Sequence, residues 1–448
     1  MYKNLTDPLQ HLFNVRREEW LPVVLAAFYF FCVLTALMVV RPAREALGMQ
    51  GGIDSLRWIF FITAFVTLMV NPVFGWLVSH LRRMRFIAVT YGFFMLGFLL
   101  FYLLLVLGPD VVGVRSGQVF YVWFSVFNLF STMVFWAVMA DRFSLEQSKR
   151  FFALIAAGGT CGAIFGPALA AVLAEPLGTA VLLLIAAGFL CLAVAAAWAL
   201  IRTQQVPGAS SKDALFSDAQ EIIGGSAWAG FRSVFQSRYL MGIAAYVIIL
   251  TIMATFIYFT RLQMVAALGD DLDMRTSMFA RIDLITQVAT LVLQVIIAGH
   301  LMKRLGVAFT LALLPITVAL GFLGLAIVGS LVALVVFEAC FRAVQRAVTR
   351  PARETLYTVV SREDKYKAKA FIDTFVYRMG DIVGAQTEGL LGRTAMGLAA
   401  LASVAIPLAV VWGALGVWLG RSQKRMTEDG SKNEGGAELA AVSSADFP

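Results

Sequence analysis

Twelve apolar runs, each about as long as a bilayer is thick, follow one another along the chain. A helix of roughly 20 apolar residues spans a hydrocarbon core of about 30 Å. The runs therefore predict an all-α polytopic membrane protein with twelve transmembrane helices. The predicted spans lie near residues 18–40, 56–79, 86–108, 119–140, 151–174, 177–201, 238–262, 275–299, 306–328, 331–350, 368–391 and 396–420.

A polar stretch separates the first six runs from the last six, so we expect two pseudo-symmetric halves. Short fragments agree with this, since "GWLVSHLRRMR" (75–85) and "GHLMKRLG" (299–306) occupy equivalent places in the two halves. Parallel repeats of this kind are a known transporter construction. The predicted domains are a cytoplasmic N-terminus (1–17), a six-helix bundle (18–201), a cytoplasmic linker (202–237), a second six-helix bundle (238–420) and a disordered cytoplasmic tail (421–448).

Composition and charge support a membrane protein rather than a nucleic-acid-binding one. Only 14% of the residues are charged and 60% are hydrophobic, whereas a soluble protein has about 25% charged residues. Lys and Arg concentrate in the loops on one side, which is the asymmetry that the positive-inside rule requires. We therefore attribute the net charge of +8 to the orientation of the protein in the membrane. This orientation places both termini in the cytoplasm, and the lipid bilayer is an expected partner.

The two basic loops resemble the hallmark Gly-x-Leu-x-Asp-Arg-x-Gly-Arg of the major facilitator superfamily. Gly75, Leu77 and Arg83 match the first copy, but Ser79 replaces the Asp and Arg82 the second Gly. The resemblance implies a secondary transporter with alternating access in a bacterial inner (plasma) membrane, expected to be a monomer. In "GGTCGAIFGP" (158–167) glycines recur every four residues. They either allow close helix packing or resemble the antiporter motif of the same superfamily.

Ionisable residues inside the spans are the candidate functional residues, because their burial in lipid is costly. In the span 331–350, Glu338, Arg342, Arg346 and Arg350 recur at every fourth position and form a stripe on one helix face. Glu338 is expected to pair with Arg342. Arg342 and Arg346 are predicted to line a substrate cavity.

The span 368–391 carries a second set of charges. Asp373 and Asp381 are candidates for ion pairs or gates, Asp381 is also a candidate proton carrier, and Arg378 is a candidate substrate ligand. A purely structural ion-pair knot with the preceding span is the alternative. In the span 275–299, Asp283 is a second candidate proton carrier, or a partner of Arg281 or Arg275.

The string Arg-Pro-Ala-Arg-Glu occurs twice, at 41–45 and at 350–354. We interpret the two copies as cationic gates at opposite membrane faces that draw in anions, or as ordinary charged helix ends. Glu45 is expected to bridge to Arg41. Within the two strings, Arg41 and Arg44 are candidates for substrate binding, and Glu45, Arg353 and Glu354 are candidates for gating. Asn128, in the span 119–140, is a further candidate for substrate binding.

Residues 350–384 resemble the ATP/ADP carrier family of bacterial and plastid nucleotide transporters. The resemblance rests on one tenth of the chain, at Pro351, Arg353, Glu354, Tyr357, Lys367, Lys369, Asp373, Arg378 and Gly380. It implies a nucleotide as one candidate substrate.

These observations predict a secondary active transporter for a small anionic solute such as a nucleotide or another phosphorylated or organic anion, working by exchange or by proton coupling. No Walker sequence occurs, so ATP hydrolysis within the chain is not expected. The alternatives are a transporter of lipids or hydrophobic compounds, a membrane-embedded enzyme, or a non-transporting scaffold. The three histidines, His11, His80 and His300, all lie away from the middle of a span. We expect no catalytic residues, no metal and no cofactor.

Overall fold

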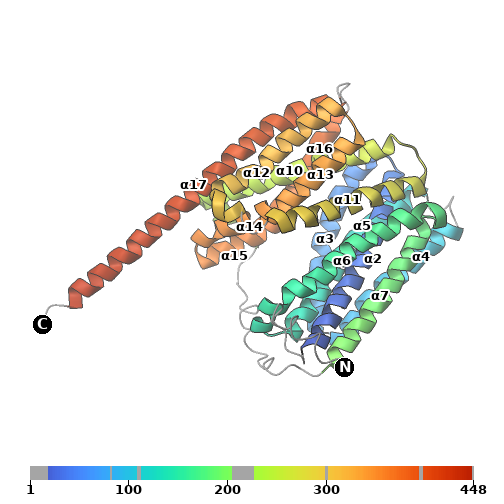
Figure 1. The fold of residues 1–448 in the computed structure, drawn as a ribbon, viewed down its shortest axis with the longest axis horizontal. Helices are drawn as coiled ribbons and strands as arrows, with labels where there is room; N and C mark the ends of the chain where they lie inside the picture. The colour runs from blue at the N-terminus through green and yellow to red at the C-terminus, as the bar shows by residue number, and fades with distance from the viewer. Residues whose placement is uncertain are drawn as a thin grey trace, which may run out of the picture. The chain divides into compact units, whose positions relative to one another are not determined.

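The computed structural model (Figure 1) describes residues 19–80, 83–107, 113–203, 227–297, 301–392 and 397–445. The predicted N-terminal segment 1–17 and residues 204–226 of the predicted linker lie outside this description, as do parts of both basic loops. The long helices are α2 (Trp20–Met49), α3 (Ile53–His80), α4 (Arg83–Leu107), α5 (Gly113–Arg142), α6 (Leu145–Leu177), α7 (Thr179–Arg202), α10 (Arg238–Ala266), α11 (Leu272–Ile297), α12 (Leu301–Val328) and α17 (Gly397–Ala445). The shorter elements are α9 (Ala227–Gln236), α13 (Leu331–Val344), η1 (Gln345–Thr349), α14 (Arg350–Thr355), η2 (Leu356–Val359), α15 (Arg362–Phe371), η3 (Ile372–Val376) and α16 (Tyr377–Gly392).

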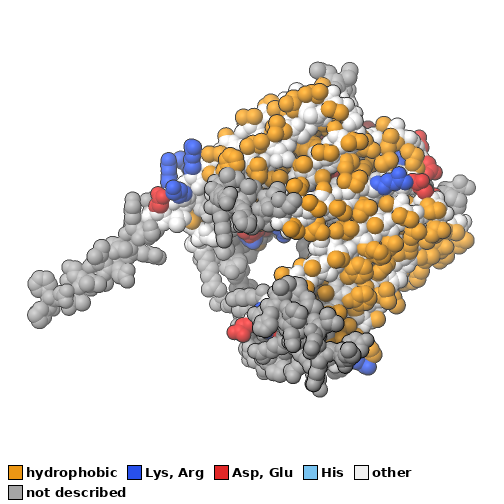
Figure 2. Space-filling model, in the orientation of Figure 1, with side chains coloured by type: hydrophobic (Ala, Val, Ile, Leu, Met, Phe, Trp, Pro, Cys, Tyr) orange, Lys and Arg blue, Asp and Glu red, His pale blue; other side chains and the backbone are white. Residues whose placement is uncertain are grey.

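All ten long helices are long and apolar enough to cross a membrane. Large apolar side chains stand on their outer faces, and Leu107, Ile327 and Val295 are each about three-quarters exposed. Figure 2 shows hydrophobic side chains spread over the visible helix flanks. Exposing such apolar surfaces to water would cost free energy, so these surfaces face lipid. The two predicted spans missing from this set, 331–350 and 368–391, are those that carry the most charge.

The chain forms two compact units, and the first comprises Met1–Ala219 and Leu262–Gln287. Within it, α2 packs most extensively on α6 and α7. The glycines of α6 explain the close packing on α2, because a Cβ on Gly158 would lie 2.3 Å from the carbonyl oxygen of Ala27 and one on Gly162 would lie 2.4 Å from that of Phe31. Close approach through small residues thus accounts for this motif.

The second unit comprises Gln220–Arg261 and Val288–Pro448. Helix α12 packs on α17 and α13, and Gly420 and Gly321 permit those contacts, because a Cβ at either position would collide with its neighbour. Two π-helical turns, η1 and η3, interrupt the helices that carry the charged residues of this unit. Such turns insert one extra residue and are frequent at functional sites.

Two features differ from the sequence-based expectation. Residues Leu262–Gln287 pack with the first unit, although the sequence placed them in the second bundle, because α11 makes polar contacts with helices of the first half. Helix α17 continues to Ala445 through the tail for which disorder was predicted. A 3.8 Å ion pair between Lys424 and Glu428 favours the helix at the start of this tail.

Candidate functional site: buried ion pairs and a cationic cavity

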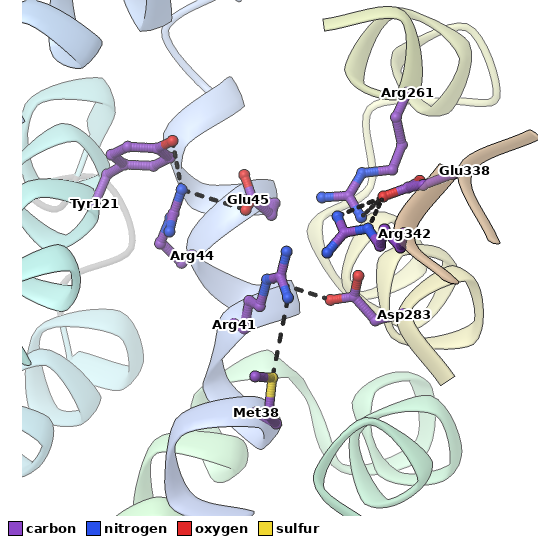
Figure 3. Close-up of polar contacts among 9 residues, drawn as sticks. All are labelled: Met38, Arg41, Arg44, Glu45, Tyr121, Arg261, Asp283, Glu338 and Arg342. Atoms are coloured by element: carbon purple, nitrogen blue, oxygen red, sulfur yellow. Dashed lines mark hydrogen bonds and ion pairs between the residues drawn. The ribbon is translucent and has the colours of Figure 1, made fainter. Parts of the chain in front are cut away.

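An ion pair between α2 and α11 lies inside the first unit. Arg41 Nε is 3.6 Å from Asp283 Oδ2, and the Asp283 side chain is only 2% exposed. Arg41 also contacts the sulfur of Met38 (Figure 3). The sequence predicted Glu45 as the partner of Arg41 and either Arg281 or Arg275 as the partner of Asp283. The structure pairs Arg41 with Asp283, a contact that local spacing could not reveal.

Arg44, one turn along α2, is held by an aromatic residue of α5. Its guanidinium hydrogen-bonds the Tyr121 hydroxyl and lies 3.9 Å from the centre of the same ring. Arg44 Nη2 is also 3.3 Å from Glu45, which is 1% exposed. Asn128 is exposed on α5. Its backbone carbonyl oxygen accepts a hydrogen bond from the Thr132 hydroxyl.

Further polar contacts fix the first turns of α11 within this unit. The backbone amide of Thr179 donates to Asp273 Oδ1 at 2.6 Å, and the Thr179 hydroxyl is 3.0 Å from that of Thr276. Arg281 pairs with Glu175 at 3.2 Å, and both side chains are about half exposed. Because the Arg281–Glu175 pair is open to solvent, it can break at little cost.

In the second unit, one buried carboxylate binds two arginines. Glu338 Oε1 accepts from Arg342 Nε at 2.9 Å and Nη2 at 2.5 Å, and from Arg261 Nη1 at 3.4 Å (Figure 3). Arg261 is fully buried and Glu338 is 2% exposed. The pairing of Glu338 with Arg342 was predicted, whereas the role of Arg261 was not.

A cavity of about 590 Å³ opens in the same unit. Of the described residues that line it, four are cationic and two are carboxylates; the lining residues are Leu250, Gln345, Arg346, Thr349, Arg350, Arg353, Glu354, Lys369, Asp373 and Tyr377. Lys369 Nζ bonds Glu354 at 2.5 Å. Arg353 Nη2 lies 3.6 Å from Asp373 and 3.9 Å from Glu354.

The charged stripe of the span 331–350 divides along the helix axis. Glu338 and Arg342 lie in α13 and join the buried ion cluster, whereas Arg346 in η1 and Arg350 and Arg353 in α14 line the cavity. The π-helical turn η1 begins between these two groups.

Outside the spans, a hydrogen bond joins α9 to the segment that carries Lys369. The Ser361 hydroxyl, at 2.8 Å, and the Ser233 hydroxyl of α9, at 2.9 Å, both donate to Asp364. These two bonds, that of Ser361 foremost, lower the pKa of the Asp364 carboxyl below its ordinary value. The described part of the predicted linker is thus a helix attached to α15.

Comparison with known proteins identifies the family. Residues 119–349 match the Major Facilitator Superfamily. The chain belongs to this superfamily. A mutant of the nucleoside transporter NupG is similar in structure, with a TM-score of 0.57 and 12% identity over 91% of this chain and 99% of the other. A bacterial homologue of the human lysosomal transporter Spinster, inward-facing and unoccupied, gives 0.58 and 12% identity over 91% and 98%. No curated protein matches the sequence.

Membership of the Major Facilitator Superfamily confirms the all-α polytopic fold class, and with it the transport class. At 12% identity the two structures establish the fold alone. The family match ends just before residues 350–384, so the resemblance of that segment to nucleotide carriers stays a prediction.

The structure therefore separates the predicted site residues into groups. Arg346, Arg353, Glu354 and Asp373 line the cavity, and Arg342 does not. Arg378 pairs with Asp381 at 3.3 Å on α16, and neither lines the cavity. Among the residues described, His, Cys, Asp and Glu form no group of three or more that could hold a metal ion.

Proposed function

We propose that the protein is a secondary active transporter that moves an anionic solute by alternating access, through exchange or proton coupling. The observation that carries this proposal is the excess of cationic over acidic side chains around the cavity of the second unit. The Major Facilitator Superfamily supplies the transport class. The charge of the cavity supplies the class of solute.

Electrostatics supports an anion over a neutral or cationic solute. Charges within membrane-spanning proteins are costly unless they face a partner or an aqueous cavity. A lining that holds Arg346, Arg350, Arg353 and Lys369 against only Glu354 and Asp373 attracts negative charge. Guanidinium groups also bind oxoanions with two parallel hydrogen bonds.

We further propose that the contacts of α11 form one gate. Alternating access requires a set of bonds that is intact in one state and broken in another. The Arg41–Asp283 and Arg281–Glu175 pairs are such bonds, as they join helices of the predicted first bundle to α11. On this proposal Arg41 and Asp283 act in gating. Asp381 is then the remaining candidate proton carrier.

Uptake into proteoliposomes tests the proposal. Purified protein is reconstituted and offered labelled nucleotides, sugar phosphates and dicarboxylates, with and without internal anion and with and without a pH gradient. We expect uptake of at least one anion class, and loss of about 90% of it or more in Arg346→Ala, since this change removes a cavity charge. Arg425→Ala is the matched control, because this arginine is exposed on α17 and does not line the cavity.

The internal conditions separate exchange from proton coupling. Uptake that requires internal anion supports exchange, and uptake driven by the pH gradient and abolished by Asp381→Asn supports proton coupling. Uptake of neutral or lipid compounds only, unchanged in Arg346→Ala, would contradict the anionic solute and favour a lipid or hydrophobic-compound transporter.

A further inference from the structure

We infer that the cavity of the second unit is a binding site for a phosphate monoester in its dianionic form. The inference rests on the proposed transport of anions and narrows the solute to one chemical class. Three observations support it: the charge balance of the cavity, the buried Nε of Arg353 that lacks a hydrogen-bond acceptor among the described residues, and the volume of the cavity.

The charge balance sets the charge of the ligand. The described lining carries four positive and two negative side chains, which leaves two positive charges in excess. Both carboxylates already have cationic neighbours, since Glu354 bonds Lys369 and Asp373 faces Arg353. A monoanion would leave one positive charge of the lining uncompensated, whereas a dianion matches the excess charge of the site.

The geometry favours a compact oxoanion. Arg353 is 7% exposed, and its buried Nε finds no hydrogen-bond acceptor among the residues that the structure describes. A buried donor of this kind costs about 1–3 kcal/mol unless an acceptor satisfies it. Arg346 and Arg350 line the same cavity, so several guanidinium groups can share the oxygens of one tetrahedral group. A dicarboxylate would divide its two charges between distant ends.

The size of the cavity indicates that the phosphate carries an organic group. A volume of about 590 Å³ falls within the range of small-molecule sites, roughly 300–1,000 Å³, and far exceeds the needs of inorganic phosphate. Leu250 and the ring of Tyr377 provide apolar lining, and Gln345 and Thr349 add polar groups. The organic group can belong to a soluble metabolite or to phosphatidic acid, since both present a phosphate monoester.

Matched ligands test the inference on the purified full-length protein. Phenyl phosphate and phenyl sulfate have the same shape, but near neutral pH the first is a dianion and the second a monoanion. Binding is measured by calorimetry and by thermal stabilisation, because a ligand that binds only the folded state raises the melting temperature. At about pH 7.5 we expect phenyl phosphate to bind roughly tenfold or more tightly than phenyl sulfate.

Acidification and one variant sharpen the test. With a second phosphate pKa of about 6, the dianion fraction falls about tenfold between pH 7 and pH 5, and the affinity for phenyl phosphate should fall with it. The affinity for phenyl sulfate should stay nearly constant over the same range. Arg346→Gln removes one of the two excess charges, so the preference for phosphate over sulfate should largely disappear. Arg425→Gln should keep the preference.

Each remaining outcome has a defined meaning. Nanodiscs with phosphatidic acid, compared with phosphatidylglycerol, identify the source of the monoester, because the latter is a phosphodiester with one charge. Equal binding of sulfate and phosphate, or binding of dicarboxylates such as succinate alone, would overturn the inference and leave anion transport intact. Binding of no anion at all, with uptake of neutral compounds, would overturn both.

Discussion

Replacing Glu338 by Gln removes a counter-charge that two arginines share. The carboxylate is 2% exposed and Arg261 is fully buried, while the Arg342 side chain is 19% exposed. The variant therefore leaves two neighbouring guanidinium groups without the carboxylate that accepts from both. Breaking a buried pair by deleting one partner costs about 3–5 kcal/mol, because the remaining charge stays desolvated.

This cost predicts a measurable fall in thermal stability. For a unit of about 200 residues, each kcal/mol shifts the melting temperature by about 2–4 °C, so Glu338→Gln should lower it by roughly 6–20 °C. Glu175→Gln is the matched control. Its partner Arg281 is 55% exposed and Glu175 is 52% exposed, and exposed pairs contribute only about 0–1 kcal/mol.

The assay is thermal unfolding of the detergent-purified variants, followed by intrinsic fluorescence. A second substitution, Arg261→Gln in the Glu338→Gln background, removes the fully buried cation and should recover about half of the lost stability. If Glu338→Gln melts at the same temperature as Glu175→Gln, the buried cluster contributes nothing to stability, and the argument from desolvation is wrong.

Two further predictions concern packing and pH. Gly158→Ala should destabilise by about 1–3 kcal/mol, because its Cβ would lie 2.3 Å from a backbone oxygen of α2; Gly188→Ala, with nothing within 4 Å of the new Cβ, should be neutral or stabilising in the same melting assay. The lowered pKa of Asp364, caused by hydrogen bonds from Ser361 and Ser233, stabilises the fold above the ordinary pKa of about 4, and this is lost as pH falls through the folded value. Ser233→Ala should therefore melt below the wild type at about pH 7, and the difference should shrink at about pH 3; a constant difference would contradict the hydrogen-bond explanation.

The helices were predictable because lipid imposes a simple rule on sequence. Runs of apolar residues mark spans, and the predicted positions fall on helices throughout the described chain. The spans 331–350 and 368–391 were also predicted, although η1 and η3 divide them into helices of fewer than 18 residues. Charge within a span is the sequence signal that points to the region of the cavity.

The site was predictable only in part, because sequence periodicity places residues on one helix face but does not give their tertiary partners. Arg342 and Arg346 were both expected to line a cavity, but Arg342 belongs to the buried ion cluster and only Arg346 lines the cavity. Arg261 lies at the end of the predicted span 238–262, and only tertiary packing shows that it is fully buried. The pairing of Arg41 with Asp283 joins two residues that are far apart in the sequence and leaves no local signal.

Two boundaries between the units fall inside continuous helices. They lie after Arg261 in α10 and after Gln287 in α11. Neither helix contains a proline, the usual cause of a sharp bend. Bending either helix would therefore sacrifice backbone hydrogen bonds. In the transport cycle proposed above, an exchange of side-chain bonds along α11 would cost less than such a bend.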